Sequence, residues 1–222
     1  LFRSYWGKKD TYAIRKLTGI VLIFSLLAAM IILVICSAFP EQLLGLFTTS
    51  PDIIMEGQIY LKILKWTFVL FLISNLLISM LRSVETVQIS FVVSVISLIV
   101  NGGINYTLIF GHFGFPEMGI KGAAIGTLTA RSLEFLIVLF YAAKIDKKVR
   151  VFDGGLLRGT FTAENRKLCR DFIKVSTPVI LSGLVWAISV PMQTAILGHL
   201  SSDAIAANSV ATTFFQYLKV IV

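Results

Sequence analysis

The sequence predicts an all-α protein, a polytopic membrane helix bundle with about six transmembrane helices. Hydrophobic residues make up 56% of the 222 residues, and they gather in six stretches that are each long enough to cross a bilayer. A transmembrane helix needs about 20 apolar residues to cross the roughly 30 Å hydrocarbon core. Only helices and closed barrels satisfy their backbone in lipid, and runs this long without alternation are typical of helices. A soluble core helix would explain any one run, but not six in succession.

The first three stretches follow one another through short connections. Leu17 to Phe39 carries no charged residue. The second stretch consists of Ile53 to Ile63 and Trp66 to Leu81, and Pro51 lies just before it. Proline is favoured at the first position of a helix because its missing N–H is not needed there. Thr86 to Gly111 is again free of Asp, Glu, Lys and Arg.

The last three stretches are more polar. Gly122 to Ala143 contains two charged residues, Val175 to Gly198 contains none, and Ala204 to Val222 contains one lysine. Gly122 and Gly126 are four residues apart, a spacing of small residues that is typical of tight helix packing in membranes. The chain opens without Met and closes inside an apolar run. We therefore expect it to be part of a longer chain.

The charge distribution predicts the orientation. The net charge is +8, and 14 of the 20 basic residues lie either before the first full helix or between the fourth and fifth. Four crossings separate these two segments, so they lie on the same side, which the positive-inside rule makes cytoplasmic. The predicted outer connections are poor in Lys and Arg. We expect the lipid bilayer as a partner, no nucleic acid, and a multi-pass protein of the cytoplasmic membrane.

The longest polar connection, residues 144–167, predicts a boundary between two lobes. Residues 1–143 would belong to the first lobe and residues 168–222 would begin the second. The connection includes several apolar residues that we expect to rest on the membrane surface. These are Val149, Val151, Phe152, Leu156, Leu157 and Phe161.

Two pairs of polar residues lie inside predicted membrane helices. Arg131 and Glu134 are three residues apart and share a helix face, so they are able to pair. A lone charge at mid-membrane costs about 2.5–3.5 kcal/mol on insertion scales, so such residues are either functional or form a self-neutralised structural pair. Asn101 and Asn105 are four apart, and they form either an ion site or, as composition favours, an interhelical hydrogen-bond pair. No metal-ligand cluster, paired acids or Ser–His arrangement is visible inside the predicted helices, so we expect no metal, no cofactor and no enzyme.

Several motifs appear in order along the whole chain. They are Tyr5-Trp6-Gly7-Lys8-Lys9-Asp10, Leu81-Arg82-Ser83, Asn101 to Gly111, Gly119 to Thr127, Pro178 to Trp186, and Ala204-Ile205-Ala206-Ala207-Asn208. Together they resemble the multidrug and toxic compound extrusion (MATE) family of cation-coupled antiporters. The resemblance implies a twelve-helix transporter of two six-helix lobes. This chain would then run from the end of the second helix to within the eighth.

The resemblance also implies a cation site at Asn101, Asn105 and Thr127. Asn105 stands where the family has an Asp, and an amide cannot carry that charge or proton. The implied function is a secondary antiporter that exports small amphipathic organic cations or drugs in exchange for Na⁺ or H⁺. A lipid-linked saccharide flippase of the same superfamily and an inactive or structural membrane fragment are the alternatives. The remainder of the longer chain would be a further partner.

Overall fold

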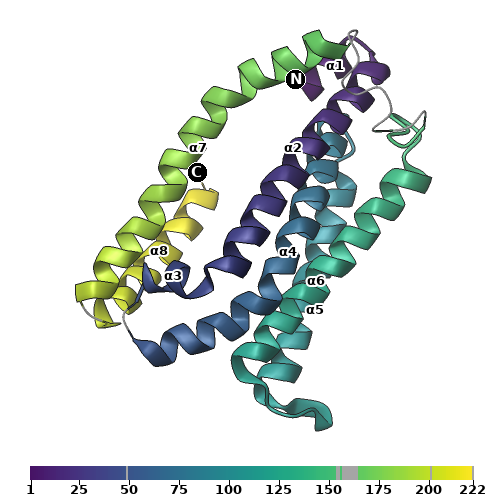
Figure 1. Cartoon of the computed structure of the whole chain (residues 1–222). Coiled ribbons are helices and arrows are strands. Elements are labelled where there is room, and N and C mark those ends of the chain that lie inside the picture. The colour runs from purple at the N-terminus through teal and green to yellow at the C-terminus, as the bar shows by residue number, and fades with distance from the viewer. Residues whose placement is uncertain (49, 154–155, 157–164, 201, 222) are drawn as a thin grey trace. The chain divides into compact units, whose positions relative to one another are not determined.

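The computed structural model describes residues 1–48, 50–153, 156, 165–200 and 202–221, and all regular elements among them are helical (Figure 1). In chain order they are α1 (Phe2–Gly7), α2 (Thr11–Ala38), α3 (Pro40–Gly45), α4 (Pro51–Ser83), α5 (Gln88–Phe110), η1 (His112–Gly114), α6 (Gly119–Phe140), η2 (Tyr141–Ile145), α7 (Arg166–Leu200) and α8 (Ser202–Ile221). Each of the six predicted stretches falls on one of the long helices.

The predicted fold class is confirmed. Among the described residues, five helices are long and apolar enough to cross a membrane: α2, α4, α5, α6 with η2, and α7 as far as Leu197. Even the 23 residues of α5 extend about 35 Å at 1.5 Å per residue, which exceeds the hydrocarbon thickness. The sixth predicted stretch lies on α8, although Val222 and several of its side chains fall outside the described residues. The protein is therefore a multi-pass membrane protein.

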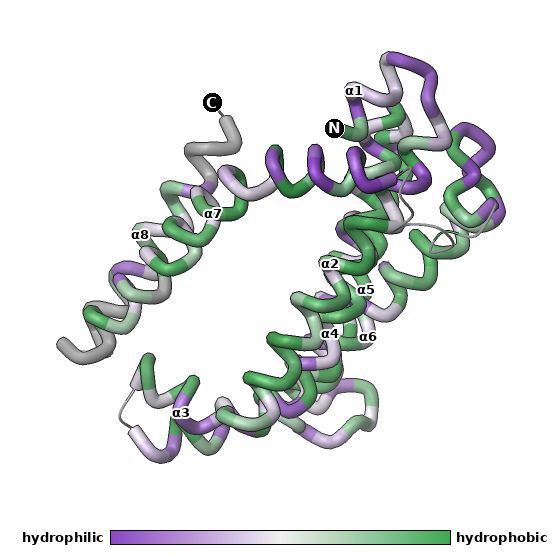
Figure 2. The backbone as a smooth tube through the Cα atoms, turned by 45° about the horizontal axis from the view of Figure 1, so that its top comes forward, coloured by the Kyte–Doolittle hydropathy of each residue, from purple (hydrophilic) through white to green (hydrophobic). Residues whose placement is uncertain are grey.

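Leu1–Ala38 and Ile59–Val175 form one compact unit, here called the first unit. Its helices carry large apolar side chains on their outer faces, such as Phe91 and Ile99 of α5, which are 71% and 67% exposed. Apolar residues follow the lengths of α2, α4, α5 and α6, and polar residues gather toward the ends (Figure 2). This is the distribution that lipid requires, because the outer faces contact acyl chains and the ends contact water.

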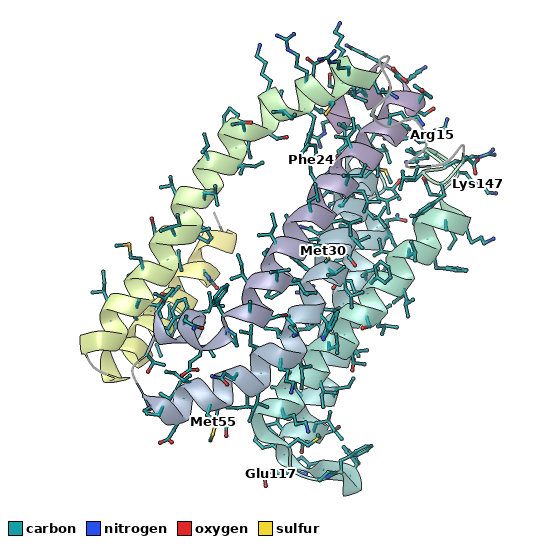
Figure 3. All side chains as sticks on the ribbon, viewed as in Figure 1. Arg15, Phe24, Met30, Met55, Glu117 and Lys147 are labelled. Atoms are coloured by element: carbon teal, nitrogen blue, oxygen red, sulfur yellow. The ribbon has the colours of Figure 1, made fainter. Side chains whose placement is uncertain are left out.

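The two basic segments meet at one end of the first unit. Arg15 and Lys147 lie at this end, whereas Glu117 lies at the other (Figure 3). The Arg15 guanidinium donates a hydrogen bond to the backbone oxygen of Asp153 at 3.2 Å. The structure therefore agrees with the prediction that both basic segments lie on the same side. That this side is cytoplasmic stays a prediction.

The segment after α6 packs into the protein, which corrects one prediction. Val149 and Val151 were expected on the membrane surface, but they are 1% and 0% exposed. They join a core cluster with Ile14, Met80, Leu81 and Val84, at the ends of α2 and α4. The sequence pattern missed this because a buried carboxylate folds the loop: Asp146 accepts the backbone N–H groups of Lys148, Val149 and Arg150 at 3.1, 3.3 and 3.2 Å. Leu157 and Phe161 lie outside the described residues.

Helices α5 and α6 form a tight antiparallel hairpin. Gly111 ends α5 in the left-handed region, with φ of 70°. A Cβ on Gly122 would lie 2.7 Å from the backbone oxygen of Leu108, and one on Gly126 would overlap the amide oxygen of Asn105. Only glycine permits this approach at both positions, so the predicted tight packing at Gly122 and Gly126 is confirmed.

The second unit comprises Phe39–Gln58 and Ser176–Val222. Near its first part, the side chain of Leu44 on α3 packs against Gly57 on α4. Between α7 and α8, the Gln193 amide donates a hydrogen bond of 3.4 Å to the Asn208 side-chain oxygen. The predicted lobe boundary at residues 144–167 stays a prediction.

Candidate functional site

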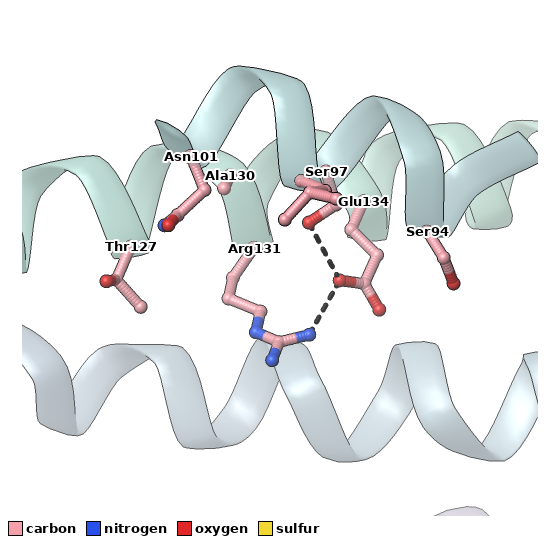
Figure 4. A pocket seen from close by; sticks show the side chains of 8 residues that line it. Ser94, Ser97, Asn101, Thr127, Ala130, Arg131 and Glu134 are labelled. Atoms are coloured by element: carbon pink, nitrogen blue, oxygen red, sulfur yellow. Dashed lines mark hydrogen bonds and ion pairs between the residues drawn. The ribbon is translucent and has the colours of Figure 1, made fainter. Parts of the chain in front are cut away.

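A polar cavity of about 400 Å³ lies beside α5 and α6 in the first unit (Figure 4). Helix α5 lines it with Ser94, Ser97, Leu98 and Asn101, and helix α6 lines it with Thr127, Ala130, Arg131 and Glu134. Six of these eight side chains are polar, although both helices have the length and composition of membrane spans. Polar groups inside a membrane bundle are costly, so their concentration here marks this cavity as the candidate site.

The structure brings Asn101 and Asn105 together. The Asn105 amide nitrogen donates a hydrogen bond of 3.0 Å to the Asn101 side-chain oxygen. Asn101 lines the cavity, whereas Asn105 lies behind it, with its own amide oxygen against Gly126. The Asn105 oxygen is buried and has no hydrogen-bond partner among the described residues. Asn105 therefore orients Asn101 toward the cavity from one turn further along α5.

Thr127 lies on the α6 side of the same cavity. Its hydroxyl donates to the backbone oxygen of Ala123 at 3.0 Å. A hydroxyl has one proton and two lone pairs, so the Thr127 oxygen remains an acceptor toward the cavity. Two of the three residues in the predicted cation site, Asn101 and Thr127, thus face one cavity, and the third positions Asn101.

Arg131 and Glu134 form an ion pair on α6, with 2.7 Å between the guanidinium and the carboxylate. The Glu134 side chain is 10% exposed and the Arg131 side chain 37% exposed. Their spacing of three residues places both on one face of the helix, as the sequence predicted. Since the pair carries no net charge, it lowers the cost of placing two ionised groups inside a membrane bundle.

Two neighbouring helices hold this ion pair. The Ser97 hydroxyl of α5 donates to the Glu134 carboxylate at 3.4 Å. The Arg131 guanidinium lies over the Phe71 ring of α4, 4.8 Å from its centroid, which is a cation–π contact. The pair on α6 is therefore connected to both α4 and α5. If the pair separated, its contacts with Phe71 on α4 and Ser97 on α5 would change as well.

Sequence reasoning missed Ser94, Ser97 and Phe71. The serines could have been found, because Ser94, Ser97 and Asn101 are spaced three and four residues apart and so share one face of a helix. Phe71 offered no such signal, since an aromatic residue in an apolar run is normally a packing residue. Its role follows only from the position of Arg131 on the facing helix.

The cavity presents oxygen atoms of hydroxyl, amide and carboxylate groups. Hard cations prefer such ligands. Within the described part of the chain, no group of three or more His, Cys, Asp or Glu side chains could hold a metal ion. The oxygen-lined cavity is therefore chemically suited to a hard cation, and the exposed Arg131 guanidinium limits how much positive charge the cavity accepts.

The fold and this cavity define a class of protein, a multi-pass α-helical membrane protein with a polar site inside its bundle. Residues 4–107 match the sequence model of the MatE family. Over these residues, the chain is similar to this family. The matched range includes Asn101 and Asn105, while Thr127, Arg131 and Glu134 lie beyond it.

Known relatives agree with this similarity. The chain is similar to a probable multidrug resistance protein, YoeA, of Bacillus subtilis, with 24% identity over 219 residues that cover 99% of this chain and 47% of the relative. It is 24% identical to a probable multidrug resistance protein, NorM, of Rhizobium meliloti, covering 94% of this chain and 44% of the relative. It is 25% identical to the multidrug resistance protein PmpM of Pseudomonas aeruginosa, covering 78% and 36%. The chain thus spans about half the length of the first relative and less than half the length of the other two.

Proposed function

We propose that this chain forms part of a secondary antiporter that exports organic cations or drugs across the cytoplasmic membrane in exchange for Na⁺ or H⁺. The match of residues 4–107 to the MatE family model supports a transporter in place of an enzyme. The names of the relatives, multidrug resistance proteins, support drug export as the direction and substrate class. The lipid bilayer and the remainder of the antiporter would be its partners.

One observation carries the proposal furthest: a polar cavity with a neutral ion pair lies in a bundle whose outer faces are apolar. A structural pair that only locks helices together needs no cavity beside it. An antiporter of this kind needs a site that the coupling ion and the organic cation occupy in turn. The coupling ion must leave this site before the organic cation binds. The cavity of about 400 Å³ that Asn101 and Thr127 line supports such a site.

The cavity offers a different ligand for each coupling ion. For Na⁺, the Asn101 carbonyl and the Thr127 hydroxyl would act as neutral oxygen donors, and Asn105 would hold Asn101 in place. For H⁺, the Glu134 carboxylate is the acid that lines the cavity, and a proton on it would weaken its bond to Arg131. Either event changes the charge of the cavity by one positive unit. Repulsion between that charge and an organic cation gives exchange its physical basis.

Ethidium, a planar lipophilic cation, provides the test. Cells that lack their main efflux pumps and express the intact protein should accumulate several-fold less ethidium than cells with an empty vector. Monensin, which dissipates the Na⁺ gradient, and a protonophore, which dissipates the H⁺ gradient, identify the coupling ion. Equal accumulation in expressing and empty cells, with the protein present in the membrane, would contradict the proposal and favour a structural role or saccharide transport.

A matched pair of variants on α5 tests whether the cavity is the site. Asn101→Leu removes the cavity-lining amide, and we expect ethidium accumulation to rise to the empty-vector level. Ile99→Leu alters a residue of the same helix that is 67% exposed and does not line the cavity. It should leave accumulation unchanged. Wild-type efflux by Asn101→Leu would place the site elsewhere in the protein.

A further inference from the structure

Helix α5 carries a stripe of polar residues that extends beyond the cavity. Ser90, Ser94, Ser97, Asn101 and Asn105 follow one another at spacings of four, three, four and four residues. At 100° per residue they fall within about 80° of the helix circumference. At 1.5 Å per residue the stripe is about 22 Å long, most of the hydrocarbon thickness. Ser94, Ser97 and Asn101 line the cavity, and the stripe continues from it in both directions.

Two hydroxyl oxygens of this stripe, those of Ser94 and Ser97, remain as acceptors because their protons are already used. Ser94 donates to the backbone oxygen of Ser90 at 2.8 Å, and Ser97 donates to Glu134 at 3.4 Å. Across the cavity, Thr127 donates to the backbone oxygen of Ala123. Each hydroxyl therefore keeps lone pairs for another partner. Such a row of oxygens attracts a cation and repels an anion.

The two ends of the stripe provide an independent observation. Among the described residues, the buried side-chain polar atoms that lack a hydrogen-bond partner are the Ser90 hydroxyl oxygen and the Asn105 amide oxygen. Ser90 is 9% exposed. Buried polar atoms in proteins are normally paired, and water fills this role where protein groups do not. Both exceptions lie on the same stripe, one at each of its ends.

The charged residues beside the stripe leave its preference for cations intact. Arg131 and Glu134 are the charged side chains that line the cavity, and they neutralise each other at 2.7 Å. The Arg131 guanidinium is directed to Glu134 and to the Phe71 ring. The remaining lining groups are neutral hydroxyls, one amide and two apolar side chains.

We propose that Ser90, Ser94, Ser97, Asn101 and Asn105 form a hydrated track along α5, by which water and a monovalent cation reach the cavity from the end of the bundle where α5 begins. Sequence prediction makes that end cytoplasmic. The proposal rests on the proposed function, because a track of this kind serves a cation site. It extends the cation site by a path from Ser90 to Ser97. It also assigns the end where α5 begins as the side from which the cation enters.

Cysteine accessibility tests the track. In the intact protein with Cys36→Ala and Cys169→Ser, single cysteines are introduced at Ser90, Ser94 and Ser97, and each is a near-isosteric change. The controls are Val92→Cys and Ile99→Cys, on the opposite face of α5, where the native side chains are 47% and 67% exposed. Permeabilised membranes are treated with the water-soluble cationic reagent MTSET. This gives access from both sides, so the result does not depend on the topology.

Cysteine reacts with this reagent as the thiolate, which forms in water and not in lipid. We therefore expect the three track positions to react at least about tenfold faster than the two controls. The anionic reagent MTSES should react more slowly than MTSET at the track positions, beyond the ratio of the two reagents with a free thiol. Equal or faster reaction with MTSES would overturn the preference for cations.

The remaining outcomes are equally decisive. Slow reaction at all three serines, equal to that of the controls, would show a dry stripe covered by another helix and would overturn the proposal. Fast reaction at Ser94→Cys and Ser97→Cys with a slow Ser90→Cys would overturn access from the end where α5 begins. Labelling is measured without transport. Fast labelling of the track positions in a protein that fails to export ethidium would refute the proposed function and still support the hydrated track.

Discussion

The two charges of the Arg131–Glu134 pair should depend on each other for stability. The double variant should therefore lose less free energy of unfolding than the sum of the two single variants. We consider Arg131→Leu, Glu134→Leu and the double variant in the intact protein. Breaking a fully buried pair by removing one partner costs about 3–5 kcal/mol, because the remaining charge is left unpaired in a low-dielectric environment. The two side chains differ in exposure, at 37% for Arg131 and 10% for Glu134. The two single variants should therefore differ as well.

Arg131→Leu leaves the more buried charge behind. Glu134 would keep only the 3.4 Å bond from Ser97, so we expect a loss near the lower end of that range, about 2–4 kcal/mol. Glu134→Leu leaves Arg131, which is more exposed to solvent and keeps its contact with the Phe71 ring, so we expect about 1–2 kcal/mol. The double variant removes both charges together. It should lose less than the sum of the singles, with a coupling free energy of about 2 kcal/mol.

Unfolding by SDS in mixed micelles, followed by tryptophan fluorescence, measures these free energies. Arg150 and Asp153 provide a matched control, since they have the same spacing and lie 3.8 Å apart with side chains 66% and 61% exposed. Their coupling should stay below about 0.5 kcal/mol, as for other surface pairs. A coupling free energy at Arg131 and Glu134 as small as that of the control pair would refute the argument that these charges depend on each other.

Three further predictions follow from single positions. Asn105→Leu should reduce efflux without lowering expression, whereas Asn105→Asp adds a titratable group and should make transport more pH-dependent; wild-type transport by Asn105→Leu would reduce Asn101 and Asn105 to a packing pair. Gly126→Ala should destabilise the α5–α6 hairpin by about 2 kcal/mol or more, because its Cβ meets the Asn105 amide oxygen, while Gly103→Ala has open space and should be neutral or stabilising; equal stability of the two variants in thermal unfolding would contradict this. In intact cells, a membrane-impermeant thiol reagent should label a cysteine at Ser50 and not one at Lys147, and the opposite pattern would overturn the predicted topology.

The fold was predictable because lipid imposes a simple rule on the sequence. Each long apolar run corresponds to a helix. The ends differ by a few residues because helices continue through polar residues beyond the apolar run, as α2 does through Arg15 and Lys16. The loop after α6 was not predictable in the same way. Val149 and Val151 look like surface-seeking apolar residues in a polar segment, and only the hydrogen bonds to Asp146 turn them inward.

The site was predictable in part for a similar reason. Charges and amides inside apolar runs are conspicuous, so Asn101, Arg131 and Glu134 could be named from the sequence. The contacts that organise them depend on which helices are neighbours, and the sequence carries no direct record of this. Ser97 and Phe71 reach the ion pair from α5 and α4, and neither helix is distinguished in the sequence as a neighbour of Arg131.

The identity of the coupling ion depends on which group in the cavity changes its charge. Asn105 is an amide, so a cation held by the polar pair on α5 would bind without exchanging a proton. The acid that lines the cavity is Glu134, and its carboxylate accepts a 2.7 Å contact from Arg131. Glu134→Gln therefore separates the two mechanisms. It should abolish efflux driven by H⁺, because no proton acceptor remains in this cavity, and it should preserve efflux driven by Na⁺ through Asn101 and Thr127. Loss of Na⁺-driven efflux in Glu134→Gln, with normal membrane expression, would show that the carboxylate itself ligates the ion.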